Sequence, residues 1–163
     1  MAITVGTDVY DTEANSDVYW TNLGNTGWTA DTSANKEINL RKATDYLERN
    51  YRFRGTRATA AQRLHFPCLE AYDDDDYQFG QTEAPTRVKE AMFIVADLYR
   101  QGTYDLEGIQ TSNDRALKRQ KVDVIEVEYD AGNRFGGADD LTHVINLLRP
   151  YVLSGGSNRL LRV

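Results

Sequence analysis

Hydrophobic residues recur at three- and four-residue steps in three long stretches of the chain, and this spacing predicts three long helices. The clearest stretch is 85–101, where Pro85 suits the first helical position and Gly102 can adopt the left-handed conformation that closes a helix. Its apolar stripe consists of Val88, Ala91, Met92, Val95, Leu98 and Tyr99. Most charged residues of the stretch, Asp97 among them, fall off this stripe. A helix this regular needs neighbours that cover its apolar face.

Two other stretches are the expected neighbours. The first, 33–51, has its apolar residues at Ile38, Leu40, Ala43, Leu47 and Tyr51. The second, 139–152, has them at Leu141, Val144, Ile145, Leu148 and Val152. Pro150 falls inside the second pattern and should kink or end that helix, because it cannot donate to the carbonyl four residues back.

A short β-hairpin is predicted near residues 117–129. Val122 and Val124 alternate with polar residues, and the alternation then continues from Ile125 in the opposite phase. This change of phase at 123–124 indicates a tight turn or a bulge. The first strand is basic and the second is acidic.

The remaining segments have weaker patterns. Residues 1–30 are expected to form an arm and a turn, with the first 15 residues loose or ordered only by partners, although Trp28 should pack on the core. Residues 58–64 are expected to be a short helix, 69–82 an irregular loop, and 154–163 a flexible tail. The prediction is therefore a single mainly α domain over 1–163. It is a small helical bundle of three long helices plus short ones in 31–153, with a β-hairpin and extended terminal arms.

Composition narrows the classes of function. The net charge is −6, which opposes long-range attraction to nucleic acid or to an anionic membrane without excluding a local basic surface. No run of 18 apolar residues is present, so no membrane span is expected.

Residues that could support catalysis or metal binding do not form a recognisable motif. Cys68 is the single cysteine, and His65 lies nearby without a third member that would orient a nucleophile–base pair. The acidic run 73–76 is interpreted as a solvated turn. A calcium loop that began at residue 73 would need glycine at position six and an acid at position twelve, but the chain has Gln78 and Ala84 there. We therefore expect no enzyme, no cofactor and no metal site.

Basic residues with interleaved aromatic residues favour an alternative, a module that binds single-stranded DNA. One cluster consists of Arg52, Arg54 and Arg57 beside Tyr51 and Phe53. A second consists of Arg115, Lys118, Arg119 and Lys121. Because the chain is acidic overall, this alternative ranks below a role in protein assembly.

The order of several segments resembles the tailed-phage head-to-tail adaptor proteins, and in particular a subgroup often labelled as putative DnaT-like single-stranded-DNA-binding proteins. The matching segments are ANKEINLRKATDYLERNY at 34–51, GTR at 55–57 with QRL at 62–64 and FP at 66–67, AP at 84–85 with VKEA at 88–91, the hairpin 118–129, and 147–153 before a Gly/Ser tail. The resemblance covers residues 30–163. Phe66 stands where the family usually has tryptophan, and Asp123 stands where the hairpin glycine is expected.

The resemblance implies a structural virion protein without catalysis or cofactor. Such a subunit forms a ring, usually of twelve copies, that joins the portal of the capsid to the tail and extends the DNA channel. The implied partners are other copies, the portal, a downstream tail or tail-completion protein, and double-stranded DNA that passes without specific contacts. The implied location is the virion neck, after synthesis in the host cytoplasm. A tail-completion protein of another ring symmetry is a further alternative.

Two segments are expected to make these contacts. The end of the tail would dock on the portal or on a neighbouring subunit through Arg159, Leu160, Leu161, Arg162 and Val163. The hairpin would form the subunit interface through Lys118, Lys121, Val122, Ile125, Glu126, Val127, Glu128 and Tyr129. The alternative function would instead use Arg52, Arg54 and Arg57 to contact DNA.

Overall fold

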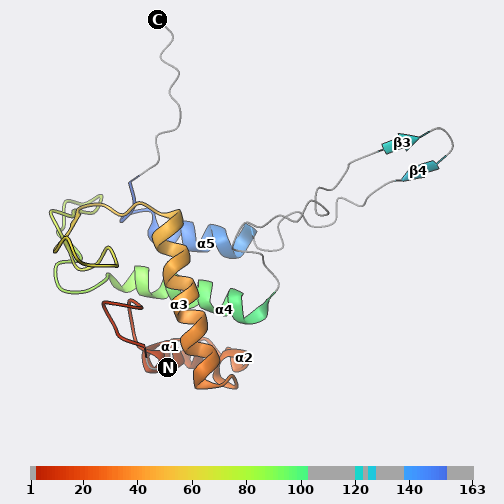
Figure 1. The fold of residues 1–163 in the computed structure, drawn as a ribbon, viewed down its shortest axis with the longest axis horizontal. Helices are drawn as coiled ribbons and strands as arrows, with labels where there is room; N and C mark the ends of the chain where they lie inside the picture. The colour runs from red at the N-terminus through yellow and green to blue at the C-terminus, as the bar shows by residue number, and fades with distance from the viewer. Residues whose placement is uncertain (1–2, 103–119, 123–124, 128–137, 154–163) are drawn as a thin grey trace, which may run out of the picture.

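The computed structural model describes residues 3–102, 120–122, 125–127 and 138–153, and this part of the chain is mainly helical, as predicted. In chain order the elements are α1 (Glu13–Asn22), α2 (Thr26–Thr29), α3 (Ser33–Asn50), β1 (Thr56–Arg57), β2 (Cys68–Leu69), α4 (Thr86–Gln101), β3 (Gln120–Val122), β4 (Ile125–Val127) and α5 (Ala138–Leu148). Figure 1 shows α3 crossing α4, with α1 and α2 near the start of α3. The irregular segment between α3 and α4 lies beside the end of α3.

Helix α4 is the centre of the fold, and its predicted stripe is confirmed. Val88, Ala91 and Val95 are fully buried, and α4 packs against both α3 and α5, the two expected neighbours. Pro85 takes the N-cap position, one residue before the helix, and Gly102 closes the helix at φ 64°. The helix therefore begins one residue later than predicted and ends where predicted.

The burial of α4 extends well beyond one stripe. Phe93 and Asp97, which lie off the predicted stripe, are only 4% exposed. The Asp97 carboxylate accepts from Asn25 Nδ2 at 2.9 Å and from Arg100 Nε at 2.6 Å. Asp97 is therefore buried although it lies off the stripe, because the N-terminal segment covers this side of α4 and Asn25 supplies a polar partner for the charge.

The N-terminal segment is folded, which corrects the expectation of a loose arm. Val9 is fully buried and Tyr10 is 3% exposed, so the start of the described chain belongs to the core. Thr12 caps α1, since its side chain accepts from the backbone N–H of Asn15. Trp28 packs in the core as expected, with no exposed surface.

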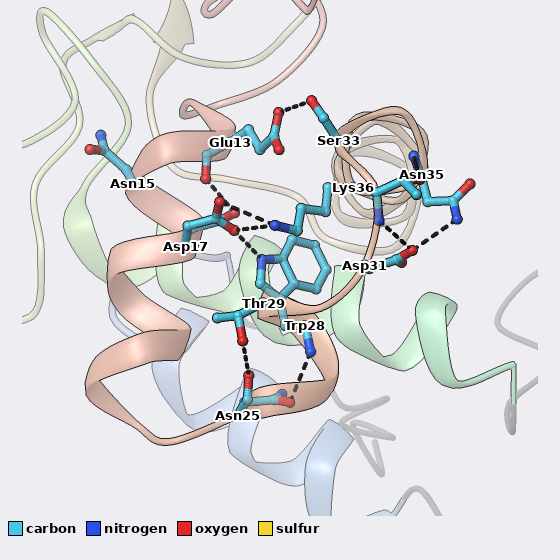
Figure 2. A network of polar contacts seen from close by, with 12 residues as sticks. Glu13, Asn15, Asp17, Asn25, Trp28, Thr29, Asp31, Ser33, Asn35 and Lys36 are labelled. Atoms are coloured by element: carbon cyan, nitrogen blue, oxygen red, sulfur yellow. Dashed lines mark hydrogen bonds and ion pairs between the residues drawn. The ribbon is translucent and has the colours of Figure 1, made fainter.

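Polar contacts fasten this segment to α3, as Figure 2 shows. Trp28 Nε1 donates to Asp17 Oδ1 at 2.9 Å, and Lys36 Nζ lies 2.9 Å from the same carboxylate oxygen. Ser33 Oγ donates to Glu13 Oε2 at 2.6 Å. Lys36 is only 5% exposed, so Asp17 neutralises a cation that would otherwise be buried unpaired.

The neighbours of α4 differ from the predicted patterns at their outer positions. Ile38 of α3 and Ile145 of α5 are 48% and 50% exposed, although both were assigned to apolar faces. Leu40 of α3 and Val144 of α5 are fully buried, as predicted. Helix α5 ends at Leu148, before Pro150, so the proline ends the helix and does not kink it. Val152 then forms an isolated antiparallel bridge with Phe53.

The predicted helix at 58–64 does not form. The two-residue strands β1 and β2 pair in antiparallel register, with Arg57 opposite Cys68. Between them, the Gln62 side-chain nitrogen lies 2.7–2.9 Å from the backbone oxygens of Leu64, His65 and Pro67. These side-chain contacts hold the backbone in an irregular loop, which overrides the local preference for helix.

The predicted β-hairpin is confirmed as a two-stranded antiparallel sheet. Gln120 pairs with Val127, Lys121 with Glu126, and Val122 with Ile125, so residues 123–124 join the strands where the change of phase was found. In the described part of the chain, no helix is long and apolar enough to cross a membrane.

Candidate nucleic-acid interface

A polar pocket of about 570 Å³ lies where α3 ends and the chain turns away from the helix. It is lined by Glu48, Arg49, Asn50, Tyr51, Arg52, Phe53, Gly55, Thr56, Arg57 and His65. Three of these ten residues are arginines, so the pocket gathers positive charge on a chain that is acidic overall.

The backbone after α3 brings these arginines together. Tyr51 leaves the helix in an extended conformation, with φ −121° and ψ 135°. Gly55 then turns the chain at φ 85°, and a Cβ at this position would lie 2.6 Å from the backbone oxygen of Leu69. Only glycine fits both the positive φ and the close approach, and the turn places Arg57 on the same pocket as Arg49 and Arg52.

Two of the three arginines have no polar partner in the part of the chain that the structure describes. Arg49 and Arg52 are exposed, and neither side chain has a hydrogen bond or ion pair within residues 3–102 and 138–153. Arg57 is also exposed, but its Nη1 donates to the backbone oxygen of Gln62 at 2.8 Å. The sequence reading included Arg52 and Arg57 but missed Arg49, because Arg49 belongs to a helix and joins the others only where that helix ends.

A half-buried carboxylate, that of Glu48, supports the floor of the pocket. Glu48 Oε1 accepts from Tyr10 Oη and from the backbone N–H of His65 at 2.8 Å. Burial, followed by the charge of Glu48, raises the pKa of Tyr10. His65 Nε2 lies 2.9 Å from the backbone oxygen of Arg54, and its ring packs against both Phe53 and Phe66. The floor is therefore held by hydrogen bonds that do not involve the exposed arginines.

Arg54, the third arginine of the predicted cluster, does not line the pocket. Its Nη2 donates to Asp74 Oδ1 at 2.6 Å, and two other donors of the guanidinium contact backbone oxygens. The sequence placed Arg52, Arg54 and Arg57 in one cluster, but the fold gives Arg54 a different set of partners.

The other predicted contact residues fall partly outside the described chain. Lys121, Val122, Ile125, Glu126 and Val127 lie on β3 and β4, where the backbone pairing is known. Lys118, Glu128 and Tyr129, and all of Arg159–Val163, lie outside the described residues. Their proposed roles remain predictions.

Neither Cys68 nor the acidic run provides catalytic or metal-binding geometry. Cys68 is fully buried, and burial raises the pKa of its thiol to about 11, which disfavours the reactive thiolate. In the acidic run, Asp73 Oδ1 accepts from the backbone N–H groups of Asp75 and Tyr77. Within the described ranges, no group of three His, Cys, Asp or Glu side chains is placed to hold a metal ion.

Comparison with known proteins identifies one family. A family model described as "Putative DnaT-like ssDNA binding protein" matches residues 2–163. The match includes the first 30 residues, which carry little of the resemblance read from the sequence, and its description names no head-to-tail adaptor. No curated protein and no solved structure matches the chain.

Proposed function

The chain belongs to the family described as putative DnaT-like ssDNA binding proteins, and we propose that it binds single-stranded DNA at the pocket that follows α3. The observation that carries this proposal is the pair Arg49 and Arg52, which are exposed beside Arg57 and lack partners in the described part of the chain. Guanidinium groups in this state can bind backbone phosphates without first giving up an internal ion pair.

An aromatic side chain lies among these cations. Tyr51 lines the pocket and is half-buried, and burial raises the pKa of its hydroxyl to about 12, so the ring is neutral at physiological pH. Its ring contacts Tyr46 at a centroid distance of 6.4 Å, which holds it in place. Nucleic-acid bases stack on such rings whatever their sequence, so binding is expected to show little sequence preference.

The overall charge limits how strong the binding can be. The net charge of −6 repels a polyanion at long range, so attraction acts only near the pocket and is strongest at low salt. Three phosphate contacts to a single strand correspond to a slope of about −2 for log K against log salt, since each contact contributes roughly −0.7.

Fluorescence anisotropy with a labelled oligothymidine of about 20 nucleotides tests the proposal, across a series of salt concentrations. We expect saturable binding at low salt with the slope given above, and weaker binding to a duplex of equal length. Absence of binding at the lowest salt would refute the proposal, as would binding that does not change with salt.

A second candidate function is the virion adaptor, a ring of twelve copies between portal and tail, and the β3–β4 hairpin favours it. Within the described residues β3 and β4 pair only with each other, and Lys121 lies opposite Glu126. Strand edges without a further partner in the described residues can pair with a neighbouring subunit. The resemblance of the segment order to phage adaptors points in the same direction.

Native mass measurement with the portal protein of the same phage tests this second function. We expect a ring-sized complex for the full chain, and its loss when the chain is truncated after Leu153, because the docking role is assigned to 159–163. The truncated chain should still fold, since Leu153 N–H donates to the backbone oxygen of Arg52 and completes the described core. A full chain that stays monomeric in the presence of portal would exclude the adaptor role.

A further inference from the structure

The guanidinium of Arg54 is held in a fixed orientation by the main chain. Its Nε donates to the backbone oxygen of Val152 at 3.3 Å, and its Nη1 donates to the backbone oxygen of Tyr72 at 3.1 Å. These two contacts leave Nη2 as the donor that faces an anion, and Asp74 Oδ1 lies 2.6 Å from it. A guanidinium oriented in this way before an anion arrives loses little entropy when it binds one.

The carboxylate that occupies this position is weakly held. The side chain of Asp74 is 59% exposed and that of Arg54 is 27% exposed, and ion pairs at such exposure contribute at most about 1 kcal/mol. The loop does not depend on Asp74 for its shape, because Asp73 makes the side-chain contacts to the loop backbone. Another anion can therefore replace the Asp74 carboxylate while the loop stays folded.

Arg54 does not line the proposed DNA pocket, but it follows Arg52, which does, by only two residues. Phe53, between the two arginines, is buried and pairs with Val152 across an antiparallel bridge. Arg52 and Arg54 flank Phe53 in this pairing, since the backbone N–H of Leu153 donates to the oxygen of Arg52 and the backbone N–H of Arg54 donates to the oxygen of Tyr151. Residues two apart in an extended segment lie roughly 7 Å from each other along the chain. A strand that contacts Arg52 can reach Arg54 with its next phosphate groups.

We propose that Arg54 is a second phosphate-binding position of this surface, filled in the free protein by the carboxylate of Asp74, which a phosphate of the DNA strand replaces. The proposal rests on the proposed binding of single-stranded DNA. Carboxylate and phosphate oxygens are interchangeable partners of a guanidinium, so Asp74 acts as an internal mimic of the phosphate. Its negative charge therefore weakens binding and reduces the number of phosphates that the free protein contacts.

The test compares Asp74→Asn with Asp75→Asn, which removes the same charge from the same acidic run without touching the Arg54 pair. With the labelled oligothymidine, we expect Asp74→Asn to tighten binding about fivefold at low salt and to steepen the salt slope by about 0.7, the contribution of one more phosphate contact. We expect Asp75→Asn to change affinity less than about twofold and to leave the slope unchanged. Equal effects of the two substitutions would overturn the proposal, since they would reflect general relief of repulsion.

Two further measurements, one in Arg54→Gln protein and one with inorganic phosphate, separate the possible outcomes. In Arg54→Gln protein, adding Asp74→Asn should give no gain in affinity; a gain of the same size as in the wild type would overturn the proposal. Because Arg54→Gln also removes contacts to Val152 and Tyr72, inorganic phosphate is titrated into Asp74→Asn protein while the Nε–H resonance of Arg54 is followed by NMR. A saturable shift that is smaller in the wild type supports the anion position, and no shift refutes it. Failure of both wild-type and Asp74→Asn protein to bind the oligonucleotide, together with a phosphate-dependent shift, would exclude the proposed function and retain the anion position.

Discussion

Replacing Trp28 with alanine is expected to lower the free energy of unfolding by about 3–5 kcal/mol, the usual cost of removing a fully buried tryptophan. Trp28 has no exposed surface, and its Nε1 donates to Asp17. The substitution leaves a cavity between the N-terminal segment and α3, and it removes one partner from the carboxylate that neutralises Lys36. Urea denaturation followed by far-ultraviolet circular dichroism measures the change.

Leu23→Ala is the matched control, because Leu23 lies in the same segment but is 62% exposed. Its substitution should change the free energy of unfolding by less than about 0.5 kcal/mol. If Trp28→Ala were as mild as Leu23→Ala, the segment around α2 would not be part of the cooperative core, and the packing of Trp28 would contribute little to stability.

Replacing both Arg49 and Arg52 with glutamine is expected to weaken binding to the oligothymidine about 10- to 100-fold at low salt. The substitutions remove two phosphate contacts, so the salt slope should become shallower by about 1.4. Stability should change little, because neither side chain has a hydrogen bond or ion pair within the described residues. Anisotropy titrations at several salt concentrations give both quantities.

Arg87→Gln is the control for this pair. Arg87 is exposed in the first turn of α4 and does not line the pocket. Its replacement removes one positive charge, as each pocket substitution does, but it removes no proposed phosphate contact. We expect less than a twofold effect on affinity. If Arg87→Gln weakens binding by half or more of the free energy lost in the double substitution, the binding is diffuse electrostatic attraction and the pocket is not the site.

Local chemistry explains why much of the fold could be read from the sequence. The stripe of α4 and the conformation of Gly102 follow from helical spacing and from the freedom of glycine at positive φ. The end of α5 follows from the missing N–H of Pro150. The hairpin register follows from the change of phase at 123–124, because strand alternation has a period of two residues.

The expectations that the structure contradicts depend on contacts between distant segments. Residues 58–64 have helical preference, but the pairing of Arg57 with Cys68 and the contacts of Gln62 decide otherwise. Asp97 lies off the apolar stripe of α4, and its burial could not be read from that stripe, because it depends on Asn25 of the N-terminal segment. The first 30 residues are polar overall, yet a few side chains such as Val9 and Trp28 suffice to attach the segment to the core.

In the candidate interface, too, some features are local and others depend on contacts between distant segments. The alternation of arginines with aromatic residues after a helix is a local feature of 51–57, so it is readable without the fold. The grouping of Arg49 with Arg52 and Arg57 around one pocket depends on the fold, and so does the pairing of Arg54 with Asp74. The reason is physical: the direction of a side chain follows from local backbone alternation and helix ends, but its partner is set by the segment that the fold brings beside it.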